Sequence, residues 1–344
     1  MRYLLLPLCL VSLNLQAQAR SVVFEDSTAQ AIVRRVVRET FMMQYMQALS
    51  TADSLEALLP GHPAAPLLKA GVLYCRMLDF EDRLDVEEFE KNYTLAWKRA
   101  EKLDKSLRPE KNLYLGILLG FKSLLHQREG QWWPAVRLGM KSVGYLKSCL
   151  DEDPFYSDAY LGVGTYKYWR SRATDFINWL PLFPDEKKIG VEMVRSAIEK
   201  GLFSREIARS TLAWILIDNG HPSEAVSLSL EGLKSYPESR FYLWTLADGY
   251  LHSRQWRKAT VEFQKLYDSL HPLKRNNGYN EVGLCKQMAR CYRNLNDPRT
   301  ELVWLERGLA VPLDKEAKKR REKDLERFRR LKDDLQKQLA TTTK

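Results

Sequence analysis

Histidine and cysteine are scarce in this chain, and neither occurs at the spacings that metal sites use. Five of each stand among 344 residues, without an H-x3-H, H-E-x2-H or C-x2-C pattern. The chain also lacks a G-x-S-x-G nucleophile elbow and a glycine-rich phosphate loop. These absences argue against zinc enzymes, α/β-hydrolases and nucleotide-binding enzymes. We therefore expect no catalytic residues, no metal and no cofactor, in a protein that is not an enzyme.

Long hydrophobic runs are also missing, and the one short run lies at the start of the chain. Residues 4–13 are apolar, follow a single charge at Arg2 and precede Ala17-Gln18-Ala19. The run is shorter than the roughly 18 residues of a membrane span, and the pattern is typical of a secretory signal peptide. We predict a signal peptide over residues 1–19, cleaved near Ala19, and an exported protein of the periplasm or cell envelope. An uncleaved anchor is the alternative.

Four cysteines follow this leader, and an exported protein offers conditions in which they could pair. Cys285 and Cys291 fall on one predicted helix, roughly 9 Å apart along its axis, which is too far for a disulfide. The sequence favours small buried thiols at all four positions. Whether any disulfide forms is left open for Cys75, Cys149, Cys285 and Cys291.

The positive charge is concentrated at the C-terminus. The formal net charge is +10, and residues 315–344 alone carry twelve Lys or Arg against six Asp or Glu. The rest of the chain is close to neutral. Since an exported protein with a near-neutral body has little reason to meet nucleic acid, we expect no nucleic-acid partner.

Two gapless 34-residue segments, 206–239 and 240–273, repeat one pattern of large and small residues. Both have Leu-Ala at the seventh and eighth places and Ala at the twentieth. Such a period predicts two amphipathic helices per unit, whose small residues let the helix backbones approach each other. Less regular copies occur around "PLLKAGVLYCRML", "DPFYSDAYLGVGTYKYW" and "CKQMARCYRNLN".

This pattern resembles the tetratricopeptide repeat (TPR) family, whose signature is W-x2-L-G-x2-Y, then A-x3-F, then P. The resemblance implies an all-α fold, a right-handed α-solenoid of about five to six helix pairs. We divide the chain into an N-terminal helical cap (20–60, with 28–58 as one helix), the repeat array (61–313) and a basic amphipathic C-terminal helix (314–344).

One unit of the array carries an insertion at residues 172–186. Its small residues Gly164 and Gly190 are 26 places apart, where the regular units have 12. We therefore place the insertion in the turn between two paired helices. Its apolar residues pack against neighbouring helices or form a flap over the groove; a membrane loop is the third alternative. The residues concerned are Trp179, Leu182 and Phe183.

The C-terminal helix has one apolar stripe, with residues three or four places apart, on an otherwise charged surface. It favours a polar helix that caps the array. A basic surface for anionic lipid or an acidic partner, and a coiled-coil contact, are alternatives. The stripe consists of Leu325, Phe328, Leu331, Leu335 and Leu339.

The resemblance also implies a concave groove that is lined by the first helix of each unit and binds a peptide. Carried over place by place, the groove is aromatic in its middle and cationic towards the C-terminus, which suits a peptide with acidic groups. The alternative is that Trp214 and Trp244 pack between units. The groove residues are Tyr168, Trp169, Trp214, Asp218, Phe241, Trp244, Asp248, His252, Lys286, Arg290 and Arg293.

We therefore expect a non-catalytic scaffold or adaptor that binds a protein or peptide partner in the cell envelope. Three alternatives remain: an accessory of outer-envelope assembly or transport, an enzyme with a site in the stretched N-terminal half, and a peripheral membrane protein that attaches through its basic tail. The sequence does not identify the partner or the oligomeric state.

Overall fold

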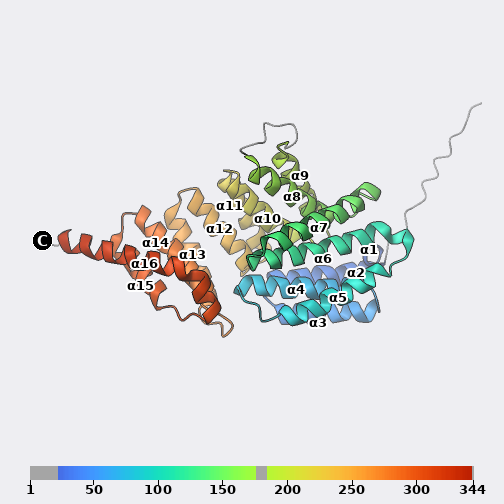
Figure 1. Cartoon of the computed structure of the whole chain (residues 1–344), viewed down its shortest axis with the longest axis horizontal. Helices are drawn as coiled ribbons and strands as arrows, with labels where there is room; N and C mark the ends of the chain where they lie inside the picture. The colour runs from blue at the N-terminus through green and yellow to red at the C-terminus, as the bar shows by residue number, and fades with distance from the viewer. Residues whose placement is uncertain (1–21, 176–183, 343–344) are drawn as a thin grey trace, which may run out of the picture.

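The computed structural model describes residues 22–175 and 184–342, and all regular structure within them is helical (Figure 1). The expected all-α class is confirmed. The predicted signal peptide (1–19) lies outside the described residues. The elements are α1 (Val22–Glu25), α2 (Ser27–Phe41), α3 (Tyr45–Leu58), α4 (Ala64–Phe80), α5 (Val86–Glu101), the 3-10 turn η1 (Lys105–Leu107), α6 (Arg108–Arg128), α7 (Trp132–Glu152), α8 (Ala159–Ala173), α9 (Lys187–Lys200), α10 (Arg205–Asp218), α11 (Pro222–Ser235), α12 (Arg240–His252), α13 (Trp256–Leu270), α14 (Tyr279–Asn294), α15 (Pro298–Ala310) and α16 (Lys315–Thr342).

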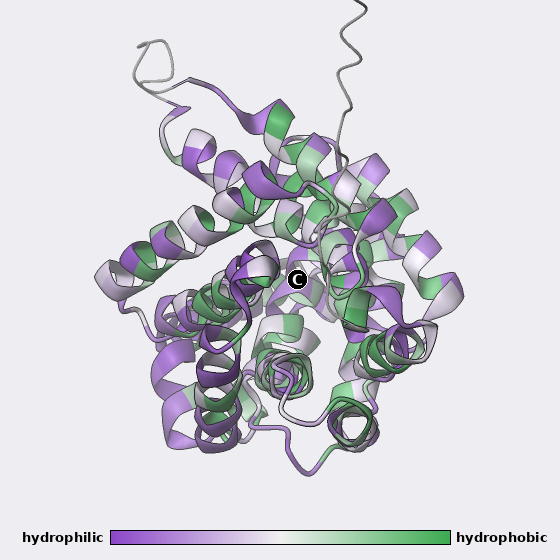
Figure 2. Ribbon diagram, turned by 90° about the vertical axis from the view of Figure 1, so that its right-hand side faces the viewer, coloured by the Kyte–Doolittle hydropathy of each residue, from purple (hydrophilic) through white to green (hydrophobic). Residues whose placement is uncertain are grey.

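Consecutive helices pack in pairs, and the pairs are stacked side by side. The six pairs from α4/α5 to α14/α15 occupy the predicted repeat array. The two gapless units correspond to α10/α11 and α12/α13, as expected. Both polar and apolar residues occur along most helices (Figure 2), so each pair buries one side and needs its neighbours to cover it.

The N-terminal cap differs from the single helix expected over 28–58. Helix α2 ends at Phe41, Met43 has a left-handed φ of 61°, and α3 then packs back against α2. The apolar periodicity on both sides of this short break suggested one helix. The cap is therefore a further helix pair in front of the six that follow.

Helices α8 and α9 pair across the predicted insertion at one point of very close backbone approach. A Cβ atom added to Gly164 would lie 2.6 Å from the carbonyl oxygen of Gly190, and one added to Gly190 would lie 2.6 Å from the oxygen of Gly164. Only glycine fits at both positions. They are the places of the repeat at which the sequence pattern predicts small residues. Of the insertion, residues 176–183 lie outside the described part, with Trp179, Leu182 and Phe183 among them.

The first and last parts of the array meet, so the array is closed on one side by a clasp between the end of α4 and the starts of α12 and α14. Arg240 Nε donates to Asp79 Oδ1 at 2.7 Å, and Tyr45 Oη donates to Asp79 Oδ2 at 2.9 Å. The Asn280 amide donates to the Asp79 carbonyl oxygen at 2.8 Å. Both Asp79 and Arg240 are buried, so this ion pair has excluded water.

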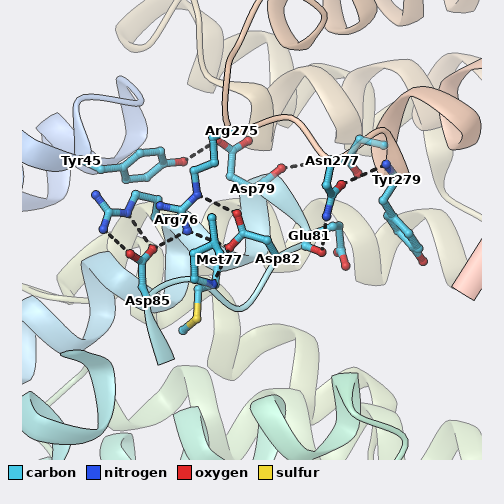
Figure 3. A network of polar contacts seen from close by, with 12 residues as sticks. Tyr45, Arg76, Met77, Asp79, Glu81, Asp82, Asp85, Arg275, Asn277 and Tyr279 are labelled. Carbon is cyan, nitrogen blue, oxygen red and sulfur yellow. Dashed lines mark hydrogen bonds and ion pairs between the residues drawn. The ribbon is translucent and has the colours of Figure 1, made fainter. Parts of the chain in front are cut away.

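The loop between α13 and α14 extends the clasp. Arg275 donates to both oxygens of Asp82 at 2.7 Å and to Asp85 Oδ2 at 2.6 Å (Figure 3). Burial opposes ionisation of Asp85, but hydrogen bonds from Arg76 and Arg275 outweigh it and lower the pKa of Asp85. This loop is the insertion that interrupts the repeat spacing near "KRNNGYNE", and in the folded chain it joins the two halves.

Helix α16 covers the apolar side of the last pair. Phe328 and Leu325 are buried, and a Cβ atom added to Gly308 would lie 2.3 Å from the Phe328 ring. Leu331 and Leu335 pack on the same cluster. The amphipathic stripe is thus directed at the protein itself. No helix in the described part of the chain is long and apolar enough to cross a membrane.

The four cysteines are free thiols. Burial raises the pKa of the thiols of Cys75, Cys285 and Cys291 to about 12, so they are protonated at neutral pH. Cys149 is fully buried as well. The prediction of small buried thiols is confirmed for Cys149, Cys285 and Cys291, whereas Cys75 keeps part of its surface exposed.

Candidate functional site on the inner helices

The inner helices α8, α10, α12 and α14 are the first helices of four successive pairs, and their starts are covered by the N-terminal half. Phe241 packs its ring against Phe41 at a centroid distance of 5.2 Å, and Ile207 belongs to the same apolar cluster. Both residues stand at the second place of their repeat. The predicted groove residue Phe241 is therefore buried against the chain's own α2.

Four further predicted groove residues are engaged within the protein. Tyr168 is buried and donates to Asp218 Oδ2 at 2.7 Å, and Arg172 donates to the same oxygen at 2.9 Å. Burial and the hydrogen bond to Asp218 raise the pKa of Tyr168. Lys286 contacts Asp324 of α16 at 2.7 Å, and Arg293 donates to Glu301 at 2.8 Å. Two of the three predicted cations are thus neutralised.

The two predicted groove tryptophans differ in their exposure. Trp244 is half-buried, and its ring meets Phe263 of α13, within the same repeat unit, edge-on at 6.4 Å. Trp214 keeps 38% of its surface exposed, and Trp169 on α8 keeps 41%. Within the described part of the chain, these two are the large hydrophobic side chains that α8, α10, α12 and α14 expose.

Asp248 is the unusual acid of this region. It is only 8% exposed, and no hydrogen bond to its carboxylate is found among the described residues. Burial raises its pKa to about 6, while the positive charges of His252 and Arg290 oppose that rise. Since His252 lies one turn further along α12 and Arg290 lies on α14, the structure brings these three predicted residues together.

We define the inner strip as Trp169, Trp214, Asp248, His252 and Arg290. Its members occupy the ninth or thirteenth places of their repeats, towards the carboxyl ends of the inner helices and away from the clasp. His252 and Arg290 are exposed, and Arg290 makes no ion pair with any residue of 22–175 or 184–342. The strip therefore offers two aromatic faces, one exposed cation and one buried acceptor.

A second opening, which the sequence reasoning missed, lies on the other face of α12. A groove of about 700 Å³ between α11 and α13 has an apolar floor that includes Leu230, Leu233, Leu243 and Leu246. On a helix of 3.6 residues per turn, Leu243 and Leu246 point away from Trp244 and Asp248. Met43, from the turn between α2 and α3, also lines the groove. Leu230 is 41% exposed, but the repeat pattern gave no reason to single it out.

The stretched N-terminal half contains one buried polar cluster of the kind that the enzyme alternative requires. His62 Nε2 lies 3.6 Å from Glu110 Oε1, and Tyr114 donates to that oxygen at 2.6 Å. Glu110 and Tyr114 have no exposed surface, so a substrate could not reach them in this conformation. The described residues contain no group of three or more His, Cys, Asp or Glu that could hold a metal ion.

Comparison with known proteins finds a likeness to solved structures. Neither a protein-family model nor a curated protein matches the sequence. The chain is similar to the crystal structure of the C-terminal part of a TPR repeat-containing protein from Cytophaga hutchinsonii, with 16% sequence identity and a TM-score of 0.42. The alignment covers 83% of this chain and 97% of that chain.

Proposed function

We propose that this protein is a non-catalytic adaptor of the cell envelope that binds a peptide segment of a partner protein along the inner strip. The observation that carries the proposal is the exposure of Trp169 and Trp214 on helices that otherwise bury their large apolar side chains. Exposed tryptophans and an arginine without an ion pair, presented by the same set of helices, are the composition of binding hot spots. The envelope location rests on the predicted signal peptide.

The chemistry of the strip restricts the partner segment. Apolar side chains would cover the two tryptophans, and an acidic side chain would pair with Arg290, whose competitors Lys286 and Arg293 already have carboxylate partners. Asp248 would accept a hydrogen bond from the peptide, because its carboxylate lies nearly buried without one. The segment is extended or helical.

The test is site-specific photo-crosslinking in the envelope of living cells. A photoreactive amino acid at position 214 should crosslink a partner protein, and the additional change Arg290→Ala should remove that crosslink. The matched control is the same amino acid at position 230, in the groove on the other face of α12. Equal crosslinking from both positions, or a position-214 crosslink that survives Arg290→Ala, would show that the strip is not the binding surface.

The packing of α16 argues against the alternative that the protein attaches to membranes through its basic tail. Its apolar stripe covers α14 and α15, so α16 has charge but no free apolar face for a bilayer.

A further inference from the structure

The most exposed apolar surface in the described part of the chain lies on α7. Trp132, Trp133, Val136 and Met140 keep 62%, 86%, 53% and 59% of their surfaces exposed. Positions 132, 136 and 140 are four residues apart, so their side chains lie on one face of the helix, with Trp133 beside them. We call these four residues the α7 patch.

The patch is exposed although α7 itself is firmly held. Ser123 Oγ donates to the Ala135 carbonyl oxygen, and Ser142 Oγ donates to the Gly116 carbonyl oxygen, each at 2.7 Å. These hydrogen bonds lock α7 onto α6 on the side opposite the patch. The exposure is therefore a property of a rigid, convex helix face.

The charge along α7 near the patch has one sign. No Asp or Glu occurs from residue 131 to residue 150, and Arg137 and Lys141 are exposed next to Trp133 without an ion pair to any described residue. The acid of the preceding turn, Glu129, is paired with Arg83 at 2.7 Å. The surface thus combines tryptophan with unneutralised positive charge.

We propose that the α7 patch docks the protein onto an anionic phospholipid surface. Tryptophan prefers the interface between headgroups and acyl chains, and lysine and arginine next to it are attracted by anionic headgroups. A convex face with protruding indole rings suits the yielding surface of a bilayer better than the shaped groove of a folded protein. The inner strip lies on other helices, so the adaptor could hold its peptide partner while it rests on the membrane.

The test is co-sedimentation of the full chain with vesicles, using phosphatidylcholine with phosphatidylglycerol and phosphatidylcholine alone. The double change Trp132→Ser, Trp133→Ser should weaken binding to the anionic vesicles by about tenfold or more. Arg137→Gln and Lys141→Gln should each weaken it by about fivefold. All four side chains are solvent-exposed, so the variants should fold. Residues 1–19 are the same in every variant, so they cannot cause a difference in vesicle binding between the variants.

Matched controls separate the patch from general stickiness and from the basic tail. Val261→Ser with Val303→Ser removes exposed apolar surface elsewhere, and Lys234→Gln with Arg257→Gln removes exposed charge elsewhere; both should bind as the unchanged protein does. Binding of the double tryptophan variant at the unchanged level, or equal binding of the unchanged protein to both vesicle types, would overturn the proposal. Photo-crosslinking at position 214 is independent of this result, so the two proposals can fail separately.

Discussion

Helix α12 is covered by the N-terminal half at its amino end, whereas its last residue, His252, is exposed. Arg240 contacts Asp79 at the end of α4, 161 residues earlier in the sequence, and Phe241 contacts Phe41 at the end of α2. About two and three turns later, respectively, Asp248 has no hydrogen-bond partner for its carboxylate among the described residues, and His252 is exposed. The same contrast holds for α10, where Ile207 packs in the closed cluster and Trp214 is exposed.

The contrast shows how a repeat array can be stable and still keep a binding surface. At the closed end, every buried charge that we describe has a partner of opposite sign. A ligand could therefore gain little free energy by pairing with these charges. At the open end, exposed aromatic surface and an unpaired buried carboxylate leave free energy that a partner could recover on binding. Mutations at the two ends should therefore act on different measurements.

The largest effect is expected at the clasp. Asp79→Ala should lower the free energy of unfolding by about 3–5 kcal/mol, because Arg240 would remain buried without its counter-ion. Urea denaturation measures this change. Asp53→Ala, which removes an exposed partner of Lys69, is the control and should cost less than about 1 kcal/mol. A similar small loss for both variants would mean that the clasp does not hold the two halves together.

The aromatic contact at the closed end should come next. Phe41 is 3% exposed and packs on Phe241, Tyr242 and Tyr236. Phe41→Ala should lower the unfolding free energy by about 3 kcal/mol through the cavity that it leaves. Val303→Ala, at an exposed position, should change it by less than about 0.5 kcal/mol. If Phe41→Ala were as mild as the control, α2 would not be packed on α12 in solution.

A pH-dependent gain is expected at the open end. Because the folded protein raises the pKa of Asp248 from 3.8 to about 6, it binds this proton more tightly than the unfolded chain does. Stability therefore falls as the pH rises from below 3.8 through about 6. Asp248→Asn should raise the unfolding free energy by about 3 kcal/mol near neutral pH.

The control for Asp248→Asn is the same urea denaturation repeated at acidic pH. Below 3.8 the carboxyl group is protonated in both the folded and unfolded states, so the variant and the unchanged protein should unfold at the same urea concentration. A gain that persists unchanged in acid would show that burial of the charge is not the cause.

The smallest effect on stability is expected at the exposed tryptophan. Trp214→Ala should change the unfolding free energy by about 0.5 kcal/mol or less, yet it should reduce capture of the partner protein strongly. Trp244→Ala is the matched comparison, since Trp244 is half-buried against Phe263 and should mainly lose stability. The distinction between the closed and open ends would be wrong if Trp214→Ala mainly lost stability and Trp244→Ala mainly lost capture of the partner.

Local periodicity made much of the fold predictable. The gapless units, the glycines that face each other in α8 and α9, and the apolar stripe of α16 all follow from contacts between neighbouring elements. The N-terminal cap was harder, because the turn at Met43 interrupts the apolar pattern only briefly. For the site, place-by-place transfer supplied the five residues of the proposed inner strip, but it could not separate them from Tyr168, Phe241, Lys286 and Arg293, which the fold engages.

The sequence by itself determined that the chain would form stacked helix pairs, because each helix carries one apolar side and small residues where its partner crosses. Only the tertiary structure decided that Asp79 meets Arg240 and that Asp82 meets Arg275. Those contacts depend on the small rotation of each helix pair relative to the previous one, added up over several pairs. A local sequence pattern does not predict this total rotation. The same accumulated geometry covers one end of the inner helices and leaves Trp214, Asp248 and Arg290 at the other.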